Sequence, residues 1–209
     1  MSRPRTAGTS RGAGELRIIG GEWRRRRLAI ADVEGLRPTP DRVRETLFNW
    51  LGQHLDGLRC LDLFAGTGAL GLEAASRGAA AVLMLERDAR AARQLQSNCQ
   101  VLGAGPVVQV LQTDALHWLG SRPTADPQER FDVVFLDPPY ALDALQRCLD
   151  ALPPLLADGA RIYLEDDAPL VAPNGWTLLR HDRAGRVFYG LLTCTPHASA
   201  SFTPVPSIP

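Results

Sequence analysis

Alternating apolar and polar positions near the start of the chain predict a β-hairpin. Leu16–Ile19 has the composition of a strand, Gly20-Gly21 that of a two-residue turn, and Glu22–Ile30 that of the returning strand. The returning strand would carry four consecutive arginines, Arg24–Arg27. Because neighbouring side chains of a strand point to opposite faces, we expect Arg24 and Arg26 on one face and Arg25 and Arg27 on the other.

A helix is expected after this hairpin. A short extended piece at 35–39 leads into it, with Thr39 as N-cap and Pro40 at the first helical position. The helical period separates an apolar face from a polar one. The apolar face holds Val43, Leu47, Phe48 and Leu51, and the polar face holds Arg42, Glu45 and Asn49.

From residue 58 onward, strand-like and helix-like patterns alternate. Strands are expected near 58–63, 80–86, 106–113, 131–136, 159–165, 175–182 and 186–193, and helices near 68–77, 88–102, 114–120 and 142–157. The last two strands lack a helix between them, and Arg183-Ala184-Gly185 fits a hairpin connection. The pattern predicts an α/β, Rossmann-like fold with a seven-stranded, mostly parallel sheet and an antiparallel C-terminal edge hairpin.

Composition divides the chain into four expected segments. They are a flexible basic arm at 1–14, a hairpin-and-helix extension at 15–53, the α/β domain at 54–195, and a Pro-rich, disordered tail at 196–209. The length of 209 residues suits one α/β domain with a small appendage. No apolar run is long enough to span a bilayer and the N-terminus lacks a signal-peptide pattern, so we expect a cytoplasmic protein.

The charged residues are unevenly distributed, although the formal net charge is zero. Residues 1–59 hold 12 arginines and 7 acidic residues, whereas residues 60–209 hold 11 arginines and 16 acidic residues. This asymmetry predicts a region that faces a polyanion, joined to an acidic core. The four cysteines are widely spaced without a CxxC motif, which favours buried thiols and no metal site.

A glycine turn between the first strand of the α/β region and its helix has the form of a cofactor site. Gly66 and Gly68 permit a tight turn and a close approach of the backbone to a ligand. Glu86 ends the next strand, where an acid can accept both ribose hydroxyls of an adenosine cofactor. NAD would satisfy both features. Asp62, just before the turn, would repel a pyrophosphate but suits an ammonium group, and therefore favours S-adenosylmethionine.

Two further residues are expected at the cofactor. Phe64 lies within the turn, and Asp114 follows the third strand of the α/β region. Asp114 can accept a hydrogen bond from the adenine amine. It can equally be the N-cap of the following helix, and the two roles are compatible.

The tetrapeptide Asp137-Pro138-Pro139-Tyr140 follows the apolar run at 131–136. Two prolines end the strand, because proline has no N–H for the ladder and restricts the residue before it. An acid, a stiff backbone and an aromatic ring are thus expected at the carboxyl end of a core strand, where open α/β sheets bind ligands.

With this tetrapeptide, the chain resembles class I methyltransferases that act on exocyclic amines. The resemblance is closer in three N-terminal blocks, at 16–24, 35–39 and 41–51, which are similar to the bacterial small-subunit ribosomal RNA guanine-N2 methyltransferases that modify guanine 966 of 16S rRNA. It covers about 15–193. It implies S-adenosylmethionine as cofactor, 16S rRNA in the small subunit or its assembly intermediate as partner, and activity as a monomer without metal.

The residues of the tetrapeptide suit methylation of the guanine N2 amine, whose lone pair is delocalised into the ring. Asp137 and the Pro138 carbonyl can accept its two N–H bonds, which favours a pyramidal nitrogen with its lone pair aimed at the methyl donor. Tyr140 can stack on the base and exclude water. Asp137 can take the proton after transfer, and a strongly raised pKa is not a prerequisite.

The arginines of the N-terminal region are candidates for gripping RNA around the target base. The set consists of Arg24, Arg25, Arg26, Arg27, Arg37 and Arg42, with Arg44 nearby. The alternative is a solvated edge strand protected by charge. Trp23, on the same hairpin, is expected to pack onto the domain.

Three other functions remain open. A DNA adenine-N6 methyltransferase shares this type of tetrapeptide, but the chain has no insertion for a target-recognition region. A protein glutamine-N5 methyltransferase typically begins the tetrapeptide with Asn, where this chain has Asp137. A non-catalytic ribosome assembly factor would not need the intact set of acids and glycines.

Overall fold

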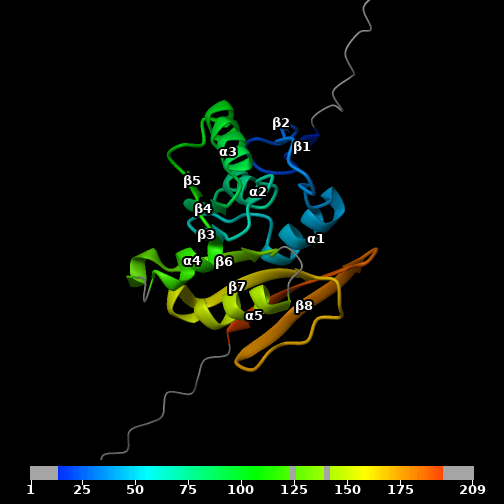
Figure 1. The fold of residues 1–209 in the computed structure, drawn as a ribbon, viewed down its shortest axis with the longest axis vertical. Coiled ribbons are helices and arrows are strands. Elements are labelled where there is room, and N and C mark those ends of the chain that lie inside the picture. The colour runs from blue at the N-terminus through cyan, green and yellow to red at the C-terminus, as the bar shows by residue number, and fades with distance from the viewer. Residues whose placement is uncertain (1–13, 123–125, 139–141, 195–209) are drawn as a thin grey trace, which may run out of the picture.

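The computed structural model describes residues 14–122, 126–138 and 142–194 of the chain. Its centre is a seven-stranded sheet in the order β5-β4-β3-β6-β7-β9-β8 (Figure 1). Five strands are parallel: β3 (Arg59–Asp62), β4 (Ala81–Glu86), β5 (Val108–Gln112), β6 (Phe131–Leu136) and β7 (Leu156–Asp166). β8 (Trp176–Ala184) and β9 (Val187–Cys194) form an antiparallel hairpin, with β9 inserted against β7. The predicted fold class is confirmed.

Helices cover both faces of this sheet (Figure 1). They are α2 (Gly71–Ser76), α3 (Ala89–Leu102), α4 (Ala115–Gly120) and α5 (Leu142–Ala151), with short 3-10 turns at Pro127–Glu129 and Pro153–Leu155. The side chains of β6 alternate between the two faces of the sheet. Val133 and Phe135 belong to one hydrophobic cluster, and Val134 and Leu136 belong to the other. The first cluster includes residues of α2 and α3, and the second those of α4 and α5.

The expected strand–helix alternation is confirmed, with shifts at the ends of elements. The largest shift of a strand start is that of β7, which begins at Leu156 and not at 159. The final hairpin turns at Gly185 and Arg186, two residues later than the predicted start of the connection at Arg183, and Gly185 has a positive φ of 63°. No helix in the described parts of the chain is long and apolar enough to cross a membrane. Cys60, Cys99 and Cys148 are buried thiols, as expected, whereas Cys194 is only partly buried.

The predicted N-terminal hairpin exists, but it is much shorter than expected. Only β1 (Glu15–Arg17) and β2 (Arg27–Ala29) pair, and the segment 18–26 between them is a loop. The predicted two-residue turn at Gly20-Gly21 is therefore wrong. Gly21 instead lies against the end of α2, where a Cβ atom would be 1.7 Å from the Ser76 carbonyl oxygen. These glycines serve a tertiary contact, which the local sequence does not show.

The expected helix is α1 (Asp41–Leu51), and its N-terminus differs from the prediction. Pro40 is the N-cap residue and no side chain caps the helix, so the assignments of Thr39 as N-cap and of Pro40 as the first helical residue are both wrong by one position. The Thr39 carbonyl instead accepts a hydrogen bond from Arg44 Nε at 3.1 Å. The two predicted faces are confirmed: the four apolar residues are buried and Arg42, Glu45 and Asn49 are exposed.

The N-terminal segment packs into the core of the α/β sheet. Leu16, Trp23 and Phe48 belong to the same hydrophobic cluster as α2, α3 and the β6 residue Phe135. The ring centroids of Phe48 and Phe135 are 6.1 Å apart. The expectation that Trp23 packs onto the domain is confirmed. Figure 1 shows α1, β1 and β2 beside α2 and α3.

Candidate active site

Four acidic side chains lie at the carboxyl ends of neighbouring strands. Asp62 ends β3, Glu86 ends β4, Asp137 directly follows β6, and Glu165 is near the end of β7. The carboxyl ends of parallel strands meet at one edge of an open sheet, which is where ligands bind in this architecture. The sequence predicts three of these acids as site residues, but not Glu165. The position of Glu165 at the end of an expected strand, like that of Glu86, is the signal that could have found it.

The glycine turn is tied to the end of β4. Gly66 and Gly68 have φ angles of 52° and 78°, in the left-handed region that favours glycine. A Cβ atom on Gly68 would lie 2.6 Å from a methyl carbon of Leu95. The Gly66 N–H donates to Glu86 Oε2 at 2.8 Å, and the Asp88 N–H donates to Glu86 Oε1 at 2.6 Å. The structure thus brings together Gly66, Gly68 and Glu86 as expected.

Asp62 is almost completely buried, with 3% of its surface exposed. Its Oδ2 atom accepts a hydrogen bond from the Gly71 N–H at 3.0 Å, and the Phe64 N–H also donates to it. Burial, together with the charge of Glu86, raises the pKa of Asp62 to about 7, although the two hydrogen bonds act in the opposite direction. Gly71 is required beside it, since a Cβ there would lie 2.6 Å from Met84 Sδ.

Asp137 and Glu165 form a pair of neighbouring acids. Leu136 of β6 pairs with Leu164 of β7. The residues that follow them in the chain, Asp137 and Glu165, are therefore also neighbours. The Tyr163 hydroxyl donates to Glu165 Oε1 at 2.7 Å. Burial, followed by the charges of Glu165 and Asp62, raises the pKa of Asp137 to about 8. Burial also raises the pKa of Glu165, although the Tyr163 hydrogen bond acts in the opposite direction.

The other predicted site residues have mixed outcomes. Pro138 is buried directly after Asp137, and Phe64 is half-buried against the second hydrophobic cluster. Asp114 is the N-cap of α4 and accepts from the His117 N–H at 3.0 Å, which confirms that assignment. Its bond to adenine stays a prediction. Tyr140 lies outside the described residues.

In the part of the chain that the structure describes, the four acids have no basic partner. Among the residues that the structure describes, none of the ion pairs includes Asp62, Glu86, Asp137 or Glu165. No group of three or more His, Cys, Asp or Glu within the described ranges could hold a metal ion. The edge of the sheet is therefore an acidic site with raised carboxyl pKa values, and a cationic ligand would favour the ionised form of these carboxyls.

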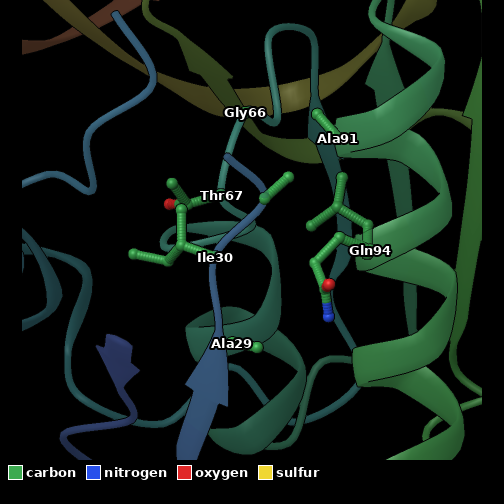
Figure 2. Close-up of a pocket in the computed structure, with 8 residues that line it drawn as sticks. Ala29, Ile30, Gly66, Thr67, Ala91 and Gln94 are labelled. Carbon is green, nitrogen blue, oxygen red and sulfur yellow. The ribbon is translucent and has the colours of Figure 1, made fainter. Parts of the chain in front are cut away.

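A small gap lies between the N-terminal segment, the glycine turn and α3. Figure 2 shows Ile30 beside Thr67, with Ala91 and Gln94 on α3 across the gap. None of the four acids lines it. The gap marks where the N-terminal segment packs on the turn, whose Gly66 lines the gap and also binds Glu86.

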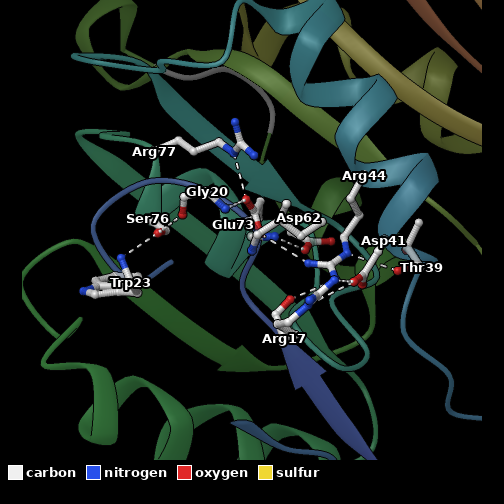
Figure 3. Close-up of polar contacts among 12 residues, drawn as sticks. Arg17, Gly20, Trp23, Thr39, Asp41, Arg44, Asp62, Glu73, Ser76 and Arg77 are labelled. Atoms are coloured by element: carbon white, nitrogen blue, oxygen red, sulfur yellow. Dashed lines mark hydrogen bonds and ion pairs between the residues drawn. The ribbon is translucent and has the colours of Figure 1, made fainter. Parts of the chain in front are cut away.

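A buried ion network fixes the N-terminal segment to α2, and its central residue, Glu73, is missed by sequence reasoning (Figure 3). Glu73 is 0% exposed. It accepts the Ile19 N–H at 2.8 Å and the Gly20 N–H at 2.7 Å. It also pairs with Arg44 at 3.3 Å and Arg77 at 2.8 Å. No local pattern distinguishes this glutamate from a solvated helical one.

Arg44 is the second member of this network, with 1% of its surface exposed. Besides Glu73, it pairs with Asp41 at 2.6 Å and donates to the Arg17 carbonyl at 2.9 Å. The expectation that Arg44 stands near RNA is wrong, because the side chain is enclosed by these partners. Since α2 also begins at Gly71, whose N–H binds Asp62, the network connects the N-terminal segment to the acidic edge.

The six candidate RNA-binding arginines are all exposed. The expected alternation of Arg24–Arg27 along a strand is wrong, because Arg24 and Arg25 lie in the loop and only Arg27 is on β2. Arg26 donates to the Val101 carbonyl at 3.0 Å, and Arg27 pairs with Glu15 at 2.9 Å. Arg25 has a φ of 70°, which is unusual for a residue other than glycine.

The strand order, the glycine turn and the acid at the end of β4 together define a class I methyltransferase with a Rossmann-like fold. The family model described as "Conserved hypothetical protein 95" matches residues 16–193, and the chain belongs to this family.

Relatives of known name support the same class. The chain is 44% identical over 186 residues to Ribosomal RNA small subunit methyltransferase D of Escherichia coli K12, covering 86% of this chain and 90% of the relative. Identity to the protein of the same name from Haemophilus influenzae is 44% over 188 residues, covering 88% and 96%.

Solved structures agree with this assignment. A putative methyltransferase from Escherichia coli matches with a TM-score of 0.75 and 43% identity, over 87% of this chain and 98% of that one. A putative methylase from Haemophilus influenzae matches with a TM-score of 0.71 and 41% identity, over 86% and 98%.

Proposed function

We propose that this protein transfers a methyl group from S-adenosylmethionine to the exocyclic N2 amine of guanine 966 in 16S ribosomal RNA of the small subunit. The unpaired acidic edge at the ends of β3, β4, β6 and β7 carries the proposal. It is supported by the relatives named as small-subunit ribosomal RNA methyltransferases. In this proposal the protein acts as a monomer in the bacterial cytoplasm.

The donor set at this edge fits S-adenosylmethionine. The cofactor bears an ammonium and a sulfonium group, and both are attracted by acids that lack a basic partner. Asp62 would hold the ammonium. Glu86 uses one lone pair on each oxygen for Gly66 and Asp88, which leaves acceptor capacity for the ribose hydroxyls. A dinucleotide pyrophosphate at the same place would be repelled.

Three more residues would complete the cofactor site. Gly66 and Gly68 allow the turn to come close to the cofactor, and Phe64 stands between Asp62 and the turn. Asp114 uses Oδ1 to cap the N-terminus of α4, so its other oxygen is available for the adenine amine. When bound, the cofactor supplies an electrophilic methyl group, which moves to nitrogen as the C–S bond breaks and S-adenosylhomocysteine leaves.

The residues after β6 would orient the amine that receives this methyl group. The carboxylate of Asp137 and the carbonyl of Pro138 accept the two N–H bonds of N2, and the lone pair then points away from both. The proline ring and its burial limit the freedom of that carbonyl. Rate acceleration comes mainly from this positioning. Tyr140 is proposed to stack on the base.

Methylation of a neutral amine gives a cationic nitrogen, which must lose one proton. Asp137 is in place to take it, and its pKa of about 8 makes its carboxylate a stronger base than an exposed aspartate. The role of Asp137 is first to orient the amine and then to accept the proton.

The exposed arginines of the N-terminal segment would hold RNA around the target base. Chemistry on a base requires removing it from the helical stack, so the surrounding backbone must be gripped. Residues 15–53 form the RNA-binding extension in this proposal, and residues 54–195 the methyltransferase domain. Arg24 and Arg25, in the loop at the tip of the extension, and Arg37 and Arg42 beyond it are the proposed phosphate contacts.

Transfer of a labelled methyl group to alternative substrates tests the proposal. Small-subunit particles lacking this modification, naked 16S rRNA, DNA and protein are each incubated with labelled S-adenosylmethionine, and products are hydrolysed to nucleosides or amino acids. We expect N2-methylguanosine from 16S rRNA. Label in N6-methyladenine of DNA or in protein glutamine would replace the proposal with the corresponding alternative, and absence of label in every substrate would favour a non-catalytic role.

A further inference from the structure

Glu165 is a second acid beside the proposed amine-binding residue. Its backbone lies next to that of Asp137 across the β6–β7 pair, because the register sets Leu136 opposite Leu164. Side chains two residues apart on a strand share a face. Asp137 therefore shares the face of Phe135, and Glu165 that of Tyr163, and both of these aromatic residues belong to the cluster beneath α1.

The side chain of Glu165 is held in a fixed position. Its Oε1 atom accepts the Tyr163 hydroxyl at 2.7 Å, and Tyr163 is completely buried. The Tyr163 ring is in turn 6.4 Å from that of Tyr189, which stacks on Trp50 of α1 at 5.5 Å. Within residues 14–122, 126–138 and 142–194, only Oε1 of Glu165 accepts a hydrogen bond, so Oε2 is available as an acceptor beside Asp137.

Two neighbouring acceptors match one edge of guanine. Guanine presents N1–H and the N2 amine side by side as donors, whereas an N1 that carries no hydrogen is an acceptor and would face a carboxylate lone pair. We propose, resting on the function proposed above, that Glu165 accepts the guanine N1–H while Asp137 holds N2, and that Glu165 thereby selects guanine over purines without an N1 hydrogen.

The electrostatics of the site are consistent with this role. Burial raises the pKa of Glu165, and the charge of Glu165 contributes to the raised pKa of Asp137. Two adjacent carboxylates repel each other, and N–H donors arriving from the base together with a nearby sulfonium would relieve that repulsion. A site built to hydrogen-bond a particular N–H rejects analogues that lack it, because its buried acceptors are left unpaired.

The test compares guanine with 2-aminopurine, which keeps the N2 amine but has an unprotonated N1. Both bases are placed at the methylated position of 16S rRNA by ligation, and the RNA is assembled into small-subunit particles. The ratio of kcat/KM for guanine to that for 2-aminopurine is measured for the full-length wild type, Glu165→Gln and Asp167→Asn. Asp167 is an exposed acid two residues further along the chain, and its substitution controls for the loss of one charge.

We expect the wild type to prefer guanine by about 100-fold or more. Glu165→Gln should lower this ratio at least 10-fold, because its amide NH₂ can donate to the N1 of 2-aminopurine. Asp167→Asn should leave it unchanged. A purely structural role for Glu165 would reduce transfer to both bases equally, and an unchanged ratio in Glu165→Gln would overturn the inference, as would a wild type that does not discriminate.

A second variant and the wild-type activity on the guanine-containing particle cover two other outcomes. If Glu165→Gln does not fold, Tyr163→Phe replaces it, because loss of the positioning hydrogen bond should lower the same ratio several-fold and an unchanged ratio counts against the inference. If the wild type does not methylate the guanine-containing particle, the function proposed above fails, and this failure differs from the loss of base selectivity alone.

Discussion

Burying a carboxylate without a cationic partner costs free energy, and at the residue scale this cost identifies the site. Asp62 keeps two backbone N–H donors, yet burial and Glu86 still raise its pKa to about 7. Asp137 lies in a similar environment and has a pKa of about 8. Residues that lower stability in this way are typical of functional sites, where a bound ligand provides the missing interaction.

Replacing Asp137 separates its chemistry from cofactor binding. Asp137→Ala removes the acceptor that orients the amine, so methyl transfer to small-subunit particles should fall about 100-fold or more. S-adenosylmethionine affinity, measured by calorimetry, should stay within a few-fold, because Asp62 and Glu86 are untouched. Asp150→Asn, an exposed acid on α5, is the control. Unchanged turnover in Asp137→Ala would falsify the role given to this residue.

The raised pKa of Asp62 has a consequence for stability. An unfolded chain ionises this carboxyl near its ordinary pKa of 3.8, whereas the folded protein retains the proton up to about 7. The folded state thus binds more protons between these values, and stability is lost as pH rises through this window. Asp62→Asn cannot ionise and should be more stable than the wild type by about 1–3 kcal/mol at pH 8.

Urea unfolding at several pH values measures this difference, which should vanish near pH 4. The variant should also bind S-adenosylmethionine more weakly, because the negative charge that faces the ammonium is gone. A stability difference that does not change between pH 4 and pH 8 would show that Asp62 does not titrate in this window.

At the element scale, the N-terminal segment is held by contacts made far away along the chain. Glu73 on α2 accepts two backbone N–H groups from the loop 18–26 and pairs with two arginines. The same helix begins at Gly71, which donates to Asp62. The loop and the acidic edge therefore depend on the position of one short helix.

Substitution of Glu73 tests this dependence. Glu73→Ala leaves the buried Arg44 without one partner and frees two N–H groups, which should cost about 3–5 kcal/mol of unfolding free energy. Glu45→Ala, on the exposed face of α1, should change stability by less than about 0.5 kcal/mol. Urea unfolding gives both values, and hydrogen exchange should show faster exchange of the Ile19 and Gly20 amides in Glu73→Ala. Similar stability of the two variants would exclude a central role for Glu73.

At the scale of the whole molecule, one face of the sheet carries both the N-terminal segment and the acids. Asp62 and Asp137 share their faces with Cys60 and Phe135, which lie in the cluster that α1, α2 and α3 cover. An arginine-bearing surface and an acidic reaction site are thereby joined through one core. This arrangement suits a polyanionic substrate. Its phosphates can contact the arginines while the reacting base enters a site that holds a cationic cofactor.

The exposed arginines provide a test at this scale. Arg24→Gln with Arg25→Gln should weaken RNA binding and reduce the slope of log affinity against log salt by about one to two, since each phosphate contact contributes about one. Arg26 and Arg27 already have partners within the protein and should contribute less. Arg180→Gln with Arg186→Gln, exposed on the final hairpin, is the charge-matched control. An unaltered slope would exclude the N-terminal loop as the grip.

Local patterns in the sequence by themselves determine most of the α/β fold. Period-two and helical patterns depend only on near neighbours in the chain, which is why most elements from β3 to β9 are predicted with small shifts. The exception is α5, which ends at Ala151 and not at 157, because a 3-10 turn at Pro153–Leu155 and the start of β7 follow it. Asp62, Gly66, Gly68, Glu86 and Asp137 are also predictable, since parallel strands present their carboxyl ends at one edge. The N-cap role of Asp114 follows from equally local geometry.

Only the tertiary structure decides how the N-terminal segment is built and which other acid joins the site. Gly20 and Gly21 resemble a hairpin turn locally, but a Cβ on Gly21 would overlap the Ser76 carbonyl at the end of α2, and one on Gly20 would meet the Arg77 guanidinium. Arg44 and Glu73 have the residue types of surface positions, but in the folded protein both are buried and they form an ion pair with each other. Glu165 meets Asp137 through strand register alone. In each case the partner is distant along the chain, so the local sequence does not show which residues will meet. For Glu165 the end of an expected strand is a local signal, but only the strand register places this acid beside Asp137.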